Sequence, residues 1–188
     1  MSEEQTPLVK PTATPAAPMP NLVAMKPANL AEAIILANTL AKSSLVPKEF
    51  GGNAANILVA IGLGAEVGLN PFQAVQSIMV VNGRPTMWGD AMLGLVRASG
   101  LLESFEESYD PKAQLATCVV KRRGCKPRTQ TYGVGDATAA GLIGKPGPWQ
   151  QYRSRMLSLR ARGFALRDEF GDVLKGLISR EEADDYPL

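Results

Sequence analysis

The chain has 188 residues, enough for one domain of ordinary size, and 45% of them are hydrophobic, which is sufficient for a buried core. Its formal net charge is only +2, so the total charge is no strong sign of a polyanionic partner. Histidine is absent, which removes the commonest general base and the commonest metal ligand. The two cysteines, Cys118 and Cys125, are too few for a disulfide framework.

The chain has no apolar run of about 18 residues and no secretory signal at its N-terminus, so we expect a cytoplasmic protein with reduced thiols. Residues 1–28 hold six of the fourteen prolines. Such a segment cannot bury enough apolar area to offset its ordering entropy, and it is predicted to be a disordered tail. Residues 29–188 are predicted to form a single domain.

The first half of this domain is predicted to hold three helices and a hairpin. Apolar spacing indicates helices at about 30–42 and 53–67, the second ended by Gly68, Asn70 and Pro71. Asn82-Gly83 between β-prone flanks predicts a hairpin over 77–88. A helix then follows over 89–98 and ends at Ser99-Gly100.

Three β-prone runs at 101–109, 115–122 and 129–134 follow, joined too closely for parallel crossovers, so they predict an antiparallel meander. A Gly/Pro turn at 144–148 leads into a long helix predicted from about 149 to 170. Residues 172–184 are predicted to form one or two short closing helices. This order of elements indicates the α+β class.

Two glycine patterns fail as nucleotide-binding motifs. Gly62, Gly64 and Gly68 miss the dinucleotide spacing by one residue, and we interpret them as glycines that let helices pack closely. Gly144-Lys145 resembles the end of a phosphate-binding loop, but Ala139 and Pro146 stand where that loop requires glycine and Ser or Thr. We therefore expect no nucleotide and no metal as a cofactor, and no enzymatic activity.

Cations cluster at two places in the second half. Five of them, Lys121, Arg122, Arg123, Lys126 and Arg128, fall within eight residues at the predicted strand turn. A solubilising loop is the plain alternative for such a run. The long helix carries five arginines before its first acid, Asp168; they are Arg153, Arg155, Arg160, Arg162 and Arg167. Arginine binds phosphate through two parallel hydrogen bonds and stacks on bases.

Helical geometry places Arg153, Arg160 and Arg167 along one edge of this helix, and Arg155 and Arg162 nearly opposite. The arc between the two edges holds Met156, Leu159, Leu166, Phe170 and Val173 and is predicted to face the core. The alternative for one edge is that it pairs with Glu103, Glu106 or Glu107 of the acidic strand.

Aromatic side chains near these arginines could stack on bases, although each is also a candidate core anchor. Trp149 and Tyr152 lie at the start of the long helix, and Trp88 closes the hairpin. The candidate DNA-binding set is Arg153, Arg155, Arg160, Arg162, Arg167, Lys121, Arg122, Arg123, Arg84, Trp149 and Tyr152.

Several short motifs occur in a recognisable order: Gly68-Leu-Asn-Pro71-Phe72, Asn82-Gly-Arg-Pro-Thr, Gly89-Asp-Ala-Met-Leu, Gly147-Pro-Trp149-Gln, Arg155-Met-Leu, Ala165-Leu-Arg167 and Phe170-Gly171. Together they span residues 30–184, and in them the chain resembles the phage single-strand annealing recombinases of the RecT and Redβ group. The resemblance implies an α+β annealing fold, also found in the eukaryotic strand-annealing mediator. It further implies a groove lined by residues matching Arg155, Arg160 and Arg167. A groove lysine of the Redβ pattern falls on Ser154 here.

The resemblance implies a function and partners too. Proteins of this group bind single-stranded DNA, hold the annealed duplex without ATP and assemble into rings or helical filaments. Some dock a phage exonuclease or a host single-strand-binding protein. We accordingly expect strand annealing in phage homologous recombination, in the cytoplasm of a bacterial host. Three alternatives stay open: a non-annealing nucleic-acid binder, a metal-dependent nuclease that uses scattered carboxylates, and a module whose arginine helix binds an acidic protein.

Overall fold

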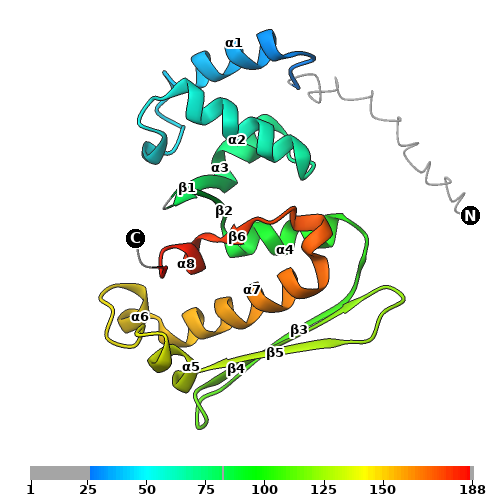
Figure 1. Ribbon diagram of the computed structural model, residues 1–188, viewed down its shortest axis with the longest axis vertical. Helices are drawn as coiled ribbons and strands as arrows, with labels where there is room; N and C mark the ends of the chain where they lie inside the picture. The colour runs from blue at the N-terminus through cyan, green and yellow to red at the C-terminus, as the bar shows by residue number, and fades with distance from the viewer. Residues whose placement is uncertain (1–25, 82, 187–188) are drawn as a thin grey trace, which may run out of the picture.

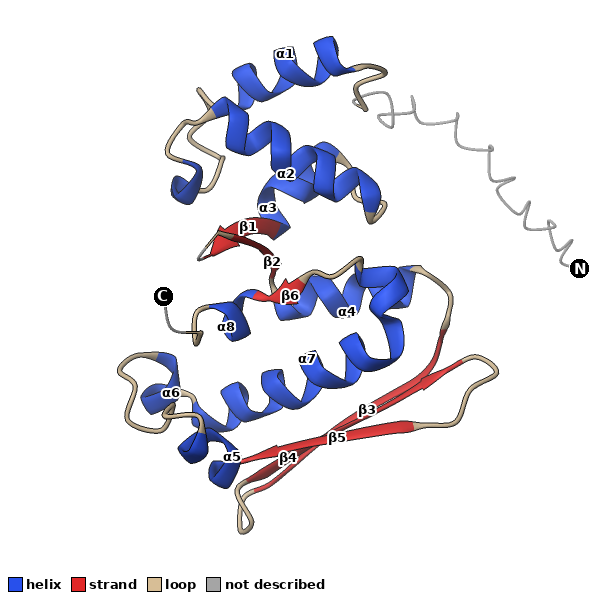
Figure 2. Ribbon diagram, in the orientation of Figure 1, coloured by secondary structure: helices blue, strands red, loops and turns tan. Residues whose placement is uncertain are grey.

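A computed structural model describes residues 26–81 and 83–186 of the chain, so nearly all of the expected tail lies outside the described residues. The fold is α+β, with two small sheets and a long helix between layers (Figures 1 and 2). The elements in chain order are α1 (Leu30–Leu40), a 3-10 turn η2 (Lys48–Phe50), α2 (Ala54–Glu66), α3 (Pro71–Ser77), β1 (Ile78–Val81), β2 (Arg84–Met87), α4 (Gly89–Ala98), β3 (Leu102–Asp110), β4 (Leu115–Arg122), β5 (Arg128–Gly133), α5 (Val134–Ala139), α6 (Pro148–Gln151), α7 (Arg153–Leu174), β6 (Ile178–Ser179) and α8 (Arg180–Ala183).

The first two predicted helices are confirmed as α1 and α2, and a third helix follows that the sequence reading missed. Asn70 and Pro71 end α2 as predicted, but they also begin α3. The Asn70 side chain accepts a hydrogen bond from the Gln73 amide, and Pro71 occupies the first helical turn, where no amide proton is needed. Gly64 of α2 lies directly against Ala74 of α3 with no room for a side chain, which confirms the close-packing interpretation for Gly64. The interpretation is wrong for Gly62 and Gly68, where an added Cβ atom would have no neighbouring atom within 4 Å.

The predicted hairpin is confirmed as β1 and β2, and its sheet gains a third strand from the far end of the chain. Ile78 pairs with Met87 and Val81 with Arg84 in antiparallel register. The two-residue strand β6 pairs in parallel with Thr86 and Met87 of β2. In place of the predicted closing helices, residues 172–184 thus contain the end of α7, a strand and one short helix.

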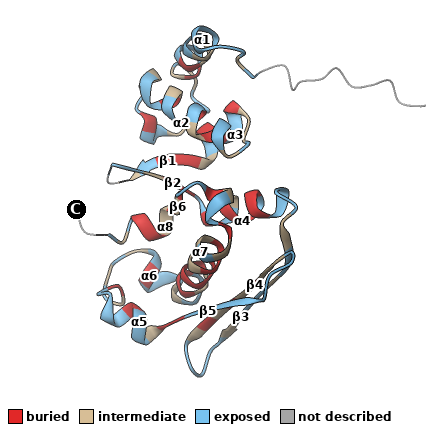
Figure 3. Cartoon of the chain, turned by 45° about the vertical axis from the view of Figure 1, so that its right-hand side comes forward, coloured by how far each residue is buried: buried red, intermediate tan, exposed pale blue. Residues whose placement is uncertain are grey.

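The predicted antiparallel meander is confirmed as the sheet β3-β4-β5. Its residues alternate between two faces. Ala116, Cys118 and Val120 of β4 are fully buried against α7, while the opposite face of the sheet is largely open to solvent (Figure 3). Burial in this core raises the pKa of the Cys118 thiol to about 12.

Helix α7 is the central layer, packed between this sheet on one side and α4 and α8 on the other (Figures 1 and 3). It begins at Arg153 rather than at Trp149, because Tyr152 adopts a non-helical backbone (φ −133°, ψ 47°) and separates α6 from α7. It extends past Phe170 to Leu174, with a local break at Phe170 (φ −125°). The predicted core arc is confirmed, but Leu157, Ala161 and Ala165 on the remaining sides are buried too.

No single helix within residues 26–81 and 83–186 combines the length and apolar composition needed to cross a membrane. Helices α2 and α3 meet that test only as a pair, and the pair is bent by 108°.

Candidate nucleic-acid interface

One edge of α7 pairs with acidic residues, as the alternative reading of the sequence expected. The guanidinium of Arg162 binds both carboxylate oxygens of Glu107 on β3, at 2.7 and 2.6 Å, and Asp90 at the start of α4. Arg155 also contacts Asp90, at 3.1 Å. Burial alone would raise the pKa of Asp90, but the hydrogen bonds and positive charge of the two arginines outweigh it and hold the pKa below its ordinary value. This edge ties α7 to α4 and to the sheet.

The opposite edge, which we name the arginine edge (Arg153, Arg160 and Arg167), faces residues 178–186, which we name the C-terminal segment. Arg160 lies 2.8 Å from Asp185, and Arg167 lies 2.9 Å from Glu182. Both carboxylates are almost completely buried. No local sequence pattern pointed to this pairing, because the partners lie in α8 and just after it, 15 or more residues beyond the arginines in the sequence.

The carboxylates of the C-terminal segment are shared among several donors. Asp185 also accepts hydrogen bonds from Lys145 and from the indole nitrogen of Trp149, at 2.8 and 2.9 Å. Tyr186 donates its hydroxyl proton to Glu182, and this bond, together with burial, raises the pKa of the tyrosine. In contrast, the Nε atoms of Arg153, Arg160 and Arg167 are buried without a hydrogen-bond partner. Two members of the arginine edge, Arg160 and Arg167, are therefore held by carboxylates.

A second group of cations lies where α4, the β4–β5 turn and α7 meet, and we name it the basic end; its members are Arg97, Lys121, Arg122, Arg123, Lys126 and Arg128. Arg123 donates from Nε to the carbonyl of Gly100, just after α4, at 2.8 Å. The guanidinium of Arg97 lies 5.3 Å from the ring centroid of Phe105 on β3. These contacts bring the end of α4 and the turn together on one surface.

Half of the basic end is neutralised by carboxylates. Lys121 pairs with Glu103, and Arg128 lies 3.7 Å from Asp168. Arg122 binds both oxygens of Asp172, at 2.6 and 2.7 Å, which lowers the pKa of that carboxyl to about 2. Within the described part of the chain, Arg97, Arg123 and Lys126 form no ion pair, and all three are exposed. The sequence reading missed Arg97, whose only signal was a cation in the last turn of a predicted helix.

The aromatic candidates differ in how far their rings are exposed. Trp149 is 1% exposed and bonded to Asp185, so it is a core residue and presents no face on which a base could stack. Tyr152 is 63% exposed beside α7. Trp88 is 40% exposed, and the guanidinium of Arg180 lies over its ring, 4.4 Å from the centroid. Arg84 is exposed and lies over the ring of Tyr186. Tyr152 is the most exposed of the three aromatic candidates, whereas Arg180 covers one face of Trp88 and Trp149 is buried.

Of the predicted site residues, the structure brings together Lys121, Arg122 and Arg123 at the basic end and separates them from Arg153, Tyr152 and Arg84. Among the described residues, no group of three or more His, Cys, Asp or Glu side chains is placed to hold a metal ion. Comparison of the chain with models of known protein families found no match, and comparison with curated proteins found none.

Proposed function

We propose that this protein binds single-stranded DNA at the basic end and anneals complementary strands without nucleotide, in phage homologous recombination in the cytoplasm of a bacterial host. The observation that carries the proposal is the group of exposed cations without ion pairs, Arg97, Arg123 and Lys126. Annealing must accept any homologous strand, so its contacts have to be made to phosphates, which carry no sequence information. Guanidinium groups suit that task, since they bind phosphate oxygens through two parallel hydrogen bonds.

The order of the elements supports the same proposal. A hairpin, a helix, a three-stranded meander and a long helix follow one another, the order that the local signals of the sequence predict. We propose that this arrangement is the annealing fold of that group.

The groove residues implied by the resemblance make contacts within the fold. Arg155, Arg160 and Arg167 each contact a carboxylate, and Arg160 is 6% exposed. The Arg160–Asp185 pair is buried on both sides, and breaking it is costly because both charges lie away from water. We therefore propose that the exposed basic end makes the first contact with a strand, and that the arginine edge chiefly holds the C-terminal segment in place.

The test is annealing of two complementary oligonucleotides, one of them labelled, without ATP and with a chelator present. The wild type should speed duplex formation under these conditions. An absolute requirement for nucleotide would sink the annealing proposal, and cleavage of the labelled strand on adding magnesium or manganese would favour the nuclease alternative. Binding of single strands without faster pairing would favour the non-annealing alternative.

The site itself is tested with the double variant Arg123→Ala/Lys126→Ala. If each residue contacts one phosphate, the log–log salt slope should fall by roughly 1.4, at about 0.7 per contact. The variant should then lose about 7-fold less affinity than the wild type between about 50 and 200 mM salt. The matched control is Lys112→Ala, an exposed lysine in the β3–β4 turn at the other end of the same sheet. Equal slopes for the double variant and the control would refute the basic end as the binding site.

A further inference from the structure

Two carboxylates lie on the surface of α7 beside the basic end. Asp168 and Asp172 are both exposed, and residues four positions apart on a helix are neighbours on its surface. Each forms an ion pair with an arginine of the sheet β3-β4-β5, Asp168 with Arg128 and Asp172 with Arg122. Negative charge beside a surface that binds phosphates opposes binding, so these two carboxylates bear directly on the proposed site.

The two ion pairs differ in geometry. Asp172 binds the guanidinium of Arg122 through both carboxylate oxygens, at 2.6 and 2.7 Å. Arg128 lies 3.7 Å from Asp168, which also accepts a hydrogen bond from Gln130 at 2.6 Å. Two parallel hydrogen bonds from one guanidinium are also the geometry in which arginine binds phosphate. Asp172 therefore occupies the edge of Arg122 that a phosphate would use.

Arg122 has two further contacts that do not involve Asp172. Its Nη1 atom donates to the carbonyl of Glu169 at 3.0 Å, and its guanidinium lies 5.6 Å from the ring centroid of Phe170. These contacts would hold the guanidinium in position without the carboxylate. The Arg122 side chain is 23% exposed and that of Asp172 56%, so an approaching strand meets the carboxylate before the arginine.

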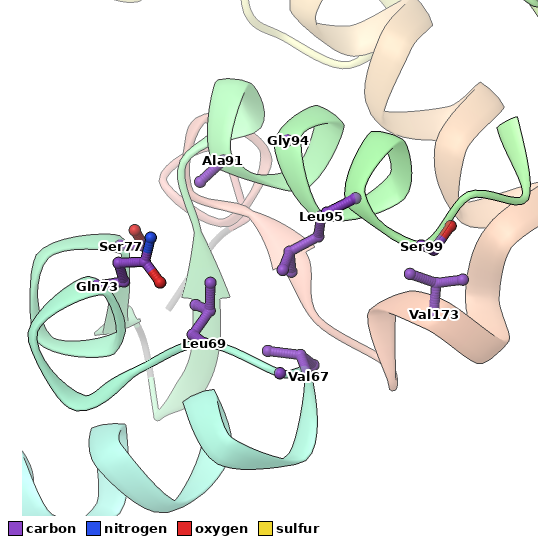
Figure 4. Close-up of a pocket in the computed structure, with 11 residues that line it drawn as sticks. Val67, Leu69, Gln73, Ser77, Ala91, Gly94, Leu95, Ser99 and Val173 are labelled. Atoms are coloured by element: carbon purple, nitrogen blue, oxygen red, sulfur yellow. The ribbon is translucent and has the colours of Figure 1, made fainter. Parts of the chain in front are cut away.

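The surface just beyond Asp172 along α7 is uncharged. Val173 faces a cleft of about 530 Å³ between the end of α2, α3 and α4, and Figure 4 shows it there beside Ser99 and Leu95. None of the residues that line this cleft has an ionisable side chain. A strand at the basic end therefore finds phosphate-binding groups on the sheet side of Asp172 and none in the cleft.

We propose that Asp172 keeps Arg122 from binding DNA phosphates and so limits the affinity of the basic end for a single strand. Its carboxylate takes the place of a phosphate on a guanidinium that is already held in position. Since the pKa of this carboxyl is about 2, it stays ionised at neutral pH and competes as an anion. A limited affinity suits annealing, because contacts made to phosphates let a strand slide until it is aligned with its complement. In this last respect the inference rests on the proposed function.

The experiment measures binding of a short single-stranded oligonucleotide at a series of salt concentrations. Asp172→Asn removes the negative charge and nearly keeps the shape of the side chain, so Arg122 is free to bind a phosphate. The variant should bind several-fold more tightly than the wild type at low salt. Its log–log salt slope should be larger by roughly 0.7, the value for one further contact on a single strand. Between about 50 and 200 mM salt it should lose about 2.6-fold more affinity than the wild type.

The matched control is Glu169→Gln, which removes a negative charge from the same turn of α7. Among the described residues the Glu169 side chain belongs to no ion pair, so this variant should change the affinity much less and leave the slope unchanged. The double variant Asp172→Asn/Arg122→Met lacks the freed cation, so the gain in affinity and in slope should disappear. An equal gain in Glu169→Gln, or a gain that persists in the double variant, would overturn the proposal, because the charge of Asp172 would then act without Arg122.

Inorganic polyphosphate serves as a second ligand, because it carries phosphate charge without bases. If Asp172→Asn gains affinity for neither ligand, the inference is overturned whatever the wild type binds. A wild type that binds the oligonucleotide in that case leaves the proposed function standing. Conversely, a wild type that binds no single strand, together with tighter binding of polyphosphate by Asp172→Asn, would refute the proposed function and support Asp172 as the restraint on a phosphate site.

Discussion

Replacing Asp185 with asparagine tests how strongly the buried ion pairs of the C-terminal segment stabilise the fold. The carboxylate is 3% exposed and accepts hydrogen bonds from Lys145, Trp149 and Arg160 at 2.8 to 2.9 Å. Asparagine has nearly the same shape, but it removes the negative charge and turns an N–H group toward one of these donors. Breaking a buried ion pair in this way costs about 3–5 kcal/mol, because Arg160 loses its nearest carboxylate and keeps only Glu182, at 4.0 Å.

The expected loss corresponds to a fall in Tm of about 6–20 °C, at roughly 2–4 °C per kcal/mol for a domain of this size. The matched control is Asp184→Asn, which removes the same charge one residue earlier. Asp184 is 50% exposed and contacts only the Arg180 side chain, at 3.5 Å, among the ion pairs of the described residues. A surface pair of this kind contributes about 0–1 kcal/mol. Thermal and urea unfolding of the two variants gives the comparison directly.

Two results would refute this reasoning. If Asp185→Asn and Asp184→Asn differed by less than about 1 kcal/mol, the buried pairs would not stabilise the fold as calculated. The second result concerns DNA, measured at a temperature where both variants are folded. We expect equal affinity for single-stranded DNA, and a several-fold gain for Asp185→Asn alone would mean that its carboxylate competes with phosphate for Arg160.

Three further outcomes are expected. In the folded protein, maleimide should label the exposed Cys125 and leave Cys118 unlabelled, because burial raises the pKa of the Cys118 thiol to about 12. Bound DNA should slow the labelling of Cys125, and mass spectrometry measures both effects. Arg162→Met should lower the free energy of unfolding by about 3–5 kcal/mol and Arg155→Met by at most about 1, because the first side chain is 6% exposed and the second 50%; similar losses in chemical denaturation would contradict this assignment. Deleting residues 1–27 should leave folding and DNA binding nearly unchanged, and insoluble protein after the deletion would show that the domain begins earlier.

The sequence predicted elements that depend on local signals and missed those that depend on distant partners. Asn82-Gly83 and the glycine after Ser99 are read from neighbouring residues, so the hairpin, α4 and the meander could be placed correctly. Strand β6 has two residues and exists only because β2, some 90 residues earlier, pairs with it. Helix α7 is buried on opposite sides, so its apolar residues do not fall on one stripe and its partners could not be read from spacing.

Prediction of the candidate site failed where it depended on partners that are distant in the sequence. One alternative drawn from the sequence was that an edge of the long helix pairs with the acidic strand, and Glu107 of β3 does pair with Arg162. The carboxylates opposite the arginine edge come from residues 182 and 185, and their approach depends on the fold of the whole second half. Exposure, which separates Arg123 from Arg160, is a property of packing that no count of cations reveals.

The parallel contact of β6 with β2 has a consequence for synthesis of the protein. Glu181, just after β6, also accepts hydrogen bonds from the amide of Gly89, so it caps α4 across 92 positions of sequence. A ribosome adds about 5–20 residues each second, so the hairpin and the start of α4 emerge roughly 5–18 s before the residues that complete them. During that interval the edge of β2 and the first amides of α4 have no partner from the C-terminal segment. The nascent chain is therefore open to misassembly at the hairpin until translation has nearly reached residue 186.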